Sequence, residues 1–148
     1  MIKDLDYMFK TNYIMVSKPM IRVFGIEAAL MLADLYSEYK YWENKKQLTS
    51  DGYFFSTVEN VENSVGLSKS QQLAAIKKLS DYGIIKKVLR GMPSKRYFRF
   101  EQHGIDKLKK EIGHELKRKV SAVDVQKRHI DVNENVAKDK SELGSYVF

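Results

Sequence analysis

The sequence predicts an α+β fold that is mainly helical, and three observations lead to this prediction. Apolar residues recur at helical spacing through residues 26–42, which contain neither glycine nor proline. A capping-box pattern at Ser68 opens a second helix over residues 68–82. Residues 84–89 and 96–100 are rich in strand formers and flank a short turn, so they predict one hairpin.

Length and composition are those of one folded domain. With 148 residues, of which 43% are hydrophobic and 11% aromatic, the chain can form one core plus an appended helix or tail. We expect a domain over residues 1–120 and a polar tail over residues 121–148. The sequence has no cysteine, which excludes disulfides and cysteine zinc sites. An acidic N-terminus and the lack of a long apolar run predict a cytoplasmic protein without a membrane span.

The N-terminal half is expected to contain two short strands and a central helix. Residues 13–16 predict an extended segment that enters the core, and residues 53–56 predict another strand. The helix over residues 26–42 has two apolar sides. The first consists of Ile26, Ala29, Leu30 and Ala33, and the second of Ala28, Met31, Leu35, Tyr39 and Trp42. This pattern fits either a core helix buried on both sides or a core helix whose second stripe forms a homodimer interface.

Capping signals define the two helices that follow. Thr57 is a good N-cap for a short helix, and residues 66–67 form the turn after it. The Ser68 hydroxyl is expected to accept from the Gln71 amide while the Gln71 side chain returns to the Ser68 backbone. Gly83 suits the left-handed conformation that ends the second helix.

A further helix is predicted after the hairpin, beginning after Gly104. Its apolar positions keep helical spacing: Ile105, Leu108, Ile112, Leu116 and Val120. Beyond Val123 the pattern ends and a polar tail is expected.

The positive charge of the chain is concentrated in one segment. Residues 66–100 contain nine Lys or Arg against one acid, whereas the segments before and after contain nearly balanced charges within a formal net charge of +7. A field of one sign on one supersecondary unit attracts polyanions. Nucleic acid is therefore the leading candidate for a partner.

The order of these elements resembles a winged helix-turn-helix with a two-stranded wing and an appended C-terminal helix. Residues 57–61, 66–68, 75–79 and 83–85 carry this resemblance. Residues 51–100 more narrowly resemble the N-terminal DNA-binding domain of replication initiator and replisome-organiser proteins of Gram-positive phages and plasmids. The resemblance implies binding to double-stranded DNA and origin recognition in DNA replication initiation, through a recognition helix over residues 68–82 and a basic wing over residues 90–99.

The resemblance also implies which residues contact DNA. The expected recognition-helix residues are Ser68, Lys69, Ser70, Gln71, Ala74, Lys77 and Lys78, and the expected wing residues are Arg90, Lys95, Arg96 and Arg99. Gln71 has two interpretations, because its side chain can pair with adenine or can be consumed by the capping box. Base readout is expected from Lys69, Ser70, Gln71, Ala74 and Lys78, although Lys77 and Lys78 favour phosphate over base. The cations of the wing are expected to contact phosphates or the minor groove.

Other functions remain as alternatives. The same surface could serve a transcription regulator at an operator, and a replication protein could contact the tail over residues 121–148. A function of a different class is a protein-interaction adaptor that does not bind DNA. No enzyme, catalytic residue, cofactor or metal site is predicted, because the three histidines lack metal-ligand spacing. Residues 131–142 resemble a calcium-binding loop only in part, since Val136 replaces the required glycine.

Overall fold

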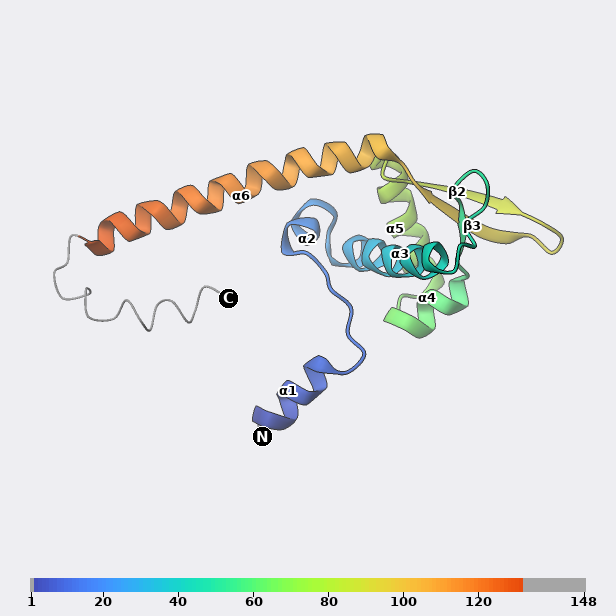
Figure 1. Cartoon of the computed structure of the whole chain (residues 1–148), viewed down its shortest axis with the longest axis horizontal. Coiled ribbons are helices and arrows are strands. Elements are labelled where there is room, and N and C mark those ends of the chain that lie inside the picture. The colour runs from blue at the N-terminus through green and yellow to red at the C-terminus, as the bar shows by residue number, and fades with distance from the viewer. Residues whose placement is uncertain (1, 132–148) are drawn as a thin grey trace. The chain divides into compact units, whose positions relative to one another are not determined.

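The structure is a computed structural model that describes the backbone of residues 2–131 and the side chains as far as Arg118. Its described part is α+β and mainly helical, with one small antiparallel sheet, which is compatible with the predicted winged helix (Figure 1). The elements are α1 (Ile2–Lys10), α2 (Lys18–Phe24), α3 (Ile26–Asn44), β1 (Phe54–Phe55), α4 (Val58–Val65), α5 (Lys69–Tyr82), β2 (Ile85–Arg90), β3 (Lys95–Phe100) and α6 (Gln102–Asp131).

The chain divides into two units, residues 1–109 and residues 110–148. The first unit contains the elements from α1 to β3 and the first turns of α6. None of the described helices is both long enough and apolar enough to cross a membrane. Residues 132–148, which include most of the predicted tail and most of the calcium-like loop, lie outside the described residues.

Helix α3 is the central core helix. Met31 and Leu35, from its second apolar stripe, are completely buried within this chain, as is Ala29 from the first. The indole of Trp42 donates a hydrogen bond to the carbonyl of Phe55, 3.1 Å away. The core interpretation is therefore confirmed for the middle of the helix, whereas Tyr39 and Trp42 are half-buried and Ile26 is exposed. The homodimer interface stays a prediction.

The N-terminal segment differs from the prediction. Residues 13–16 form no strand, and Tyr13 and Met15 are largely exposed. A strand requires a neighbour to satisfy its backbone, and residues 13–16 pair with neither edge of the sheet, whose order is β1-β3-β2. Two unpredicted helices, α1 and α2, instead lie on either side of this segment, and Pro19 stands in the first turn of α2, where its missing N–H costs nothing.

The capping predictions for α4 and α5 are confirmed. The Thr57 hydroxyl accepts from the Asn60 amide at 3.0 Å. Ser68 and Gln71 form the complete capping box, with 3.3 Å from the Gln71 amide to Ser68 Oγ and 2.9 Å from the Ser68 amide to Gln71 Oε1. Gly83 adopts a φ of +94° at the end of α5. Local side-chain chemistry therefore fixes where α5 begins and ends.

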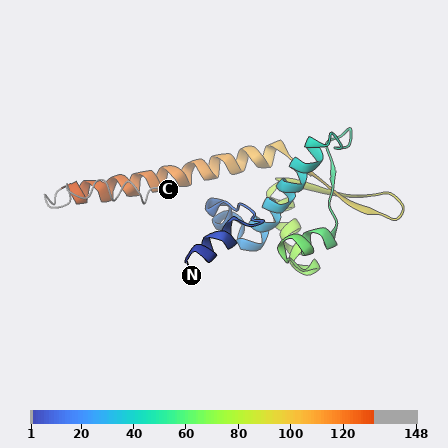
Figure 2. The same ribbon diagram turned by 60° about the horizontal axis from the view of Figure 1, so that its bottom comes forward.

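Strands β2 and β3 form the predicted hairpin, whose turn projects away from the helices in both views (Figures 1 and 2). Alternation along the strands gives the sheet two faces. The inner face carries buried Ile85 and Phe98 and packs on the helices. The outer face carries Val88, paired with Tyr97.

A buried arginine joins the hairpin to α4 and α5. Arg96 is only 8% exposed, and its guanidinium donates to the Ser56 carbonyl at 2.9 Å and to Gln72 Oε1 at 3.0 Å. The Gln72 amide in turn donates to the carbonyls of Val58 and Leu67. Burial lowers the pKa of Arg96, and the nearby Glu38 carboxylate offsets part of this effect.

The carboxyl group of Glu38, on α3, interacts with this arginine and with Asp34. Asp34 accepts a hydrogen bond from the Ser64 hydroxyl at 2.7 Å. Burial and, to a smaller extent, Asp34 raise the pKa of Glu38, the Ser56 hydroxyl and Arg96 lower it, and the net result is a pKa of about 7. Glu38 therefore titrates in the neutral range.

Helix α6 begins at Gln102 and runs to Asp131, past the expected end at Val123. The domain boundary at residue 120 stays a prediction. Gly104, in its first turn, meets the end of α5. A Cβ atom at Gly104 would lie 2.2 Å from the Gly83 carbonyl oxygen. Since this atom belongs to the backbone, no side chain fits at residue 104.

We expect Gly104→Ala to lower the free energy of unfolding by about 3 kcal/mol, because the new methyl group must displace backbone. Gly113→Ala is the matched control, since a Cβ there meets nothing within 4 Å. It should raise stability by about 0.5–1 kcal/mol through helix propensity. Urea unfolding of both variants measures the difference, and equal stabilities would contradict the close contact.

We expect Arg96→Ala to cost about 3 kcal/mol, because it leaves the Gln72 and Ser56 oxygens buried without their donor. Lys95→Ala, at the exposed neighbouring position, should change stability by less than about 0.5 kcal/mol. Chemical unfolding distinguishes the two, and an Arg96→Ala variant as stable as the wild type would contradict the role of the guanidinium.

Glu38 should make the fold less stable as pH rises. Its pKa is higher in the folded chain than its ordinary value of 4.5, so the folded state holds the proton more tightly. Stability is therefore lost between about pH 4.5 and pH 7. From pH 5 to pH 8 the wild type should lose about 2 kcal/mol more than Glu38→Gln. Glu62→Gln, at an exposed position, should keep the pH dependence of stability that the wild type shows. Identical pH profiles for the wild type and Glu38→Gln would rule out the contribution of Glu38.

Candidate nucleic-acid interface

Helix α5 presents one exposed face, which we call the α5 face. Its members recur at helical spacing: Lys69, Ser70, Leu73, Ala74, Lys77, Lys78 and Asp81. The opposite side is buried and includes Ala75, Ile76 and Leu79. Five of the predicted contact residues, Lys69, Ser70, Ala74, Lys77 and Lys78, are thereby brought together on one surface.

Gln71 acts in the capping box. Its Oε1 accepts from the Ser68 amide, and its Nε2 donates to Glu27 Oε1 at 3.1 Å. Both ends of the side-chain amide are therefore occupied within the chain. Ser68 is half-buried and its hydroxyl accepts from the Gln71 amide, so both residues position the helix start.

Two lysines of the α5 face are already engaged. Lys78 Nζ donates to the Phe24 carbonyl at 2.9 Å, which ties α5 to the end of α2. Lys77 forms an exposed ion pair with Asp81 at 2.9 Å, of a kind that contributes little and exchanges readily. Lys69 forms no ion pair with any described residue, and it lies in the first turn of the helix.

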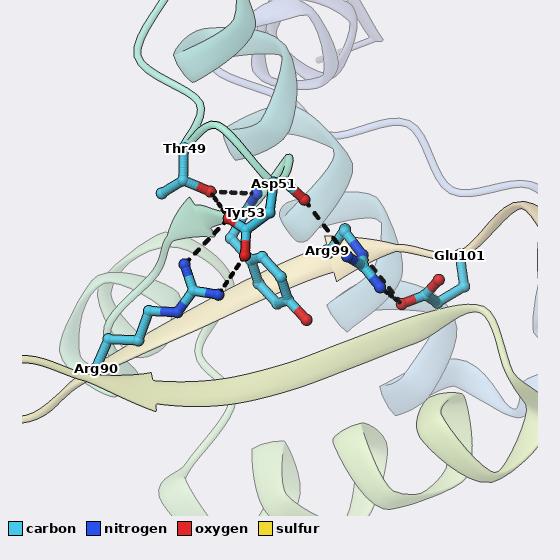
Figure 3. A network of polar contacts seen from close by, with 6 residues as sticks. All are labelled: Thr49, Asp51, Tyr53, Arg90, Arg99 and Glu101. Atoms are coloured by element: carbon cyan, nitrogen blue, oxygen red, sulfur yellow. Dashed lines mark hydrogen bonds and ion pairs between the residues drawn. The ribbon is translucent and has the colours of Figure 1, made fainter.

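The arginines on the outer face of the hairpin are held by the loop before β1 (Figure 3). Arg90 donates to both carboxylate oxygens of Asp51, and its guanidinium lies over the Tyr53 ring at 4.4 Å. Arg99 covers the same ring at 4.9 Å and pairs with Glu101 at 2.8 Å. The hydrogen bonds from Arg90 hold the pKa of Asp51 well below its usual range.

The cations of the hairpin are divided between the two faces of the sheet. In the strand register, Lys86 lies opposite Arg99, and Arg90 lies opposite Lys95. These four side chains therefore share the outer face. Lys87 shares the inner face with Arg96. The expectation of one basic wing surface is therefore only partly met.

Arg96 requires a correction. We expected it to contact DNA, but alternation places it on the inner face, where its guanidinium is buried against Gln72. Its role is to position the hairpin against α5. Exposed Lys95 is better placed to meet a ligand, although its ammonium also lies 5.2 Å from the Phe55 ring.

Three exposed residues of this region, Leu73, Lys86 and Lys87, were not among the predicted DNA contacts. Leu73 stands four residues from both Lys69 and Lys77, so helical spacing alone could have assigned it to the α5 face. Strand alternation from buried Ile85 could likewise have separated the faces of Lys86 and Lys87.

No group of three or more acidic, histidine or cysteine side chains that could hold a metal ion occurs in the part of the chain that the structure describes. The α5 face offers exposed ammonium groups, the Ser70 hydroxyl, apolar side chains and the carboxylate of Asp81, which is paired with Lys77. These groups can bind a polyanion, and they include neither an activated nucleophile nor a paired base.

No protein-family model matches the chain, and no curated protein matches it in sequence. One solved structure with which the chain can be superposed in part is described as "N-Terminal domain of DNA binding protein". The superposition covers 73% of this chain and 90% of that structure, with 17% sequence identity and a TM-score of 0.47.

Proposed function

We propose that the chain binds double-stranded DNA through the α5 face and the lysines of the hairpin. The observation that supports this most directly is the concentration of nine cations against one acid in residues 66–100. That segment folds into a capped helix followed by a hairpin, and Lys69, Lys86, Lys87 and Lys95 stand exposed on it. An exposed field of one sign on a rigid support suits a polyanion of repeating charge.

The dimensions of α5 suit the major groove. Its 14 residues span about 21 Å, and an α-helix fits the width of the groove. The capping box fixes the first turn, which is the part of a recognition helix that lies nearest the bases. In this arrangement Lys69 and Lys77 neutralise phosphates, and the hairpin lysines contact the backbone beside the groove.

The biological role that we propose is origin recognition in the replication of a phage or plasmid type element. This proposal rests on the resemblance of residues 51–100 to the DNA-binding domains of replication initiators. A transcription regulator would use the same surface. Mapping of bound sites across the genome distinguishes the two, because an initiator occupies repeats clustered at an origin, whereas a regulator occupies separate promoter sites.

We expect Lys69→Ala to weaken binding to all duplexes by a similar factor, because the contact is to phosphate. About five neutralised phosphates give a slope of about −4.5 for log K against log salt, and Lys69→Ala should reduce its magnitude by about one. Lys109→Ala, an exposed charge change on α6, is the control and should leave both values unchanged. Fluorescence anisotropy with a labelled duplex measures them.

A salt slope near zero would contradict DNA binding by this surface. If the chain is instead an adaptor that does not bind DNA, neither the wild type nor Lys69→Ala would change the anisotropy of the labelled duplex. Arg96→Ala is unsuitable for this test, since loss of the buried guanidinium disturbs the fold itself.

A further inference from the structure

The centre of the α5 face is apolar. Leu73 is 48% exposed although it is a large hydrophobic residue, and Ala74 beside it is also exposed. Lys69 and Lys77 stand one turn before and one turn after Leu73, on the same side of the helix. The apolar centre is therefore flanked by positive charge along the helix axis.

The polar side chains of α5 that could read base edges are occupied elsewhere. Gln71, which could pair bidentately with adenine, is held by the capping box and by Glu27. Gln72 is fully buried, and its amide serves Arg96 and two backbone carbonyls. Lys78 donates to Phe24. Ser70 is the one uncharged polar residue that the exposed face of α5 offers within the described chain, and its hydroxyl lies 3.2 Å from that of Ser68.

We infer that α5 recognises DNA through the C5-methyl groups of thymine in the major groove, with Leu73 and Ala74 as the contact residues. The inference rests on the proposed function. Thymine carries the apolar group among the base edges that B-DNA presents in this groove, and apolar side chains are its complement. The Gln71 amide is engaged within the chain, and the centre of the α5 face is apolar. This face is therefore better suited to contact methyl groups than to read hydrogen-bond patterns on the bases.

The charge around the apolar centre favours DNA over a protein as its occupant. Beside Ala74 lies a hollow of about 250 Å³ with a mixed lining, in which Ile26 and Ala28 stand next to Glu27 and Lys78. Lys69 and Lys77 border this surface, and the hairpin that follows α5 adds further cations. Phosphates flank the thymine methyl groups on both sides of the groove, so the duplex matches both the apolar centre and its charged ends.

Replacement of thymine by uracil tests this directly, because it removes the methyl group and keeps the Watson–Crick hydrogen bonds. The full chain is titrated into alternating d(A-T) and alternating d(A-U) duplexes at the same salt concentration, so that no target sequence needs to be known. We expect about four-fold weaker binding for each contacted methyl group, the value for one apolar carbon returned to water. Leu73→Ala should weaken binding to d(A-T) and bring the ratio of the two affinities close to one.

Lys86→Ala is the control for this comparison, because it should lower both affinities and leave their ratio unchanged. Circular dichroism confirms that each variant keeps the wild-type helix content. Equal affinity of the wild-type chain for the two duplexes, or an unchanged ratio in Leu73→Ala, would overturn methyl recognition while DNA binding stands. Absence of binding to both duplexes at low salt would instead overturn the proposed function and the inference with it.

Discussion

The contact between the Arg96 guanidinium and Gln72 is the interaction on which the arrangement of helix and hairpin depends. Gln72 belongs to α5 and Arg96 to the central strand of the sheet, so their hydrogen bond sets the position of one against the other. The carbonyls of Ser56, Val58 and Leu67 complete the network and connect the ends of β1 and α4 to it. A buried ionised group of this kind is tolerated because its hydrogen bonds are satisfied within the core.

The sequence predicts this fold best where the responsible interactions are local. The starts of α4 and α5 follow from Thr57 and Ser68, because a side-chain oxygen that reaches an amide three residues on needs no other part of the chain. The segment over residues 13–16 was predicted wrongly for the opposite reason. The strand formers in this segment carry no information about which sheet edge they could join. Among the described residues, no strand pairs with this segment.

The candidate site shows the same division. Charge counting located the basic segment correctly, since composition needs no coordinates. It could not show which cations are free, because Arg90 and Lys78 find their partners at Asp51 and Phe24, which are distant in sequence. Gln71 left two interpretations open in the sequence, and only its neighbour Glu27, from α3, shows how both ends of its amide are used.

The pairing of Arg90 with Asp51, and of Arg99 with Glu101, has an energetic consequence for ligand exchange. These carboxylates already supply the arginines with the anionic partners that a phosphate would offer, so a duplex gains there only the difference between two similar ion pairs. The two acids thus act as resident counter-ions of the arginines. If the chain binds DNA as proposed, the exposed lysines are left to supply the counter-ion release that drives association.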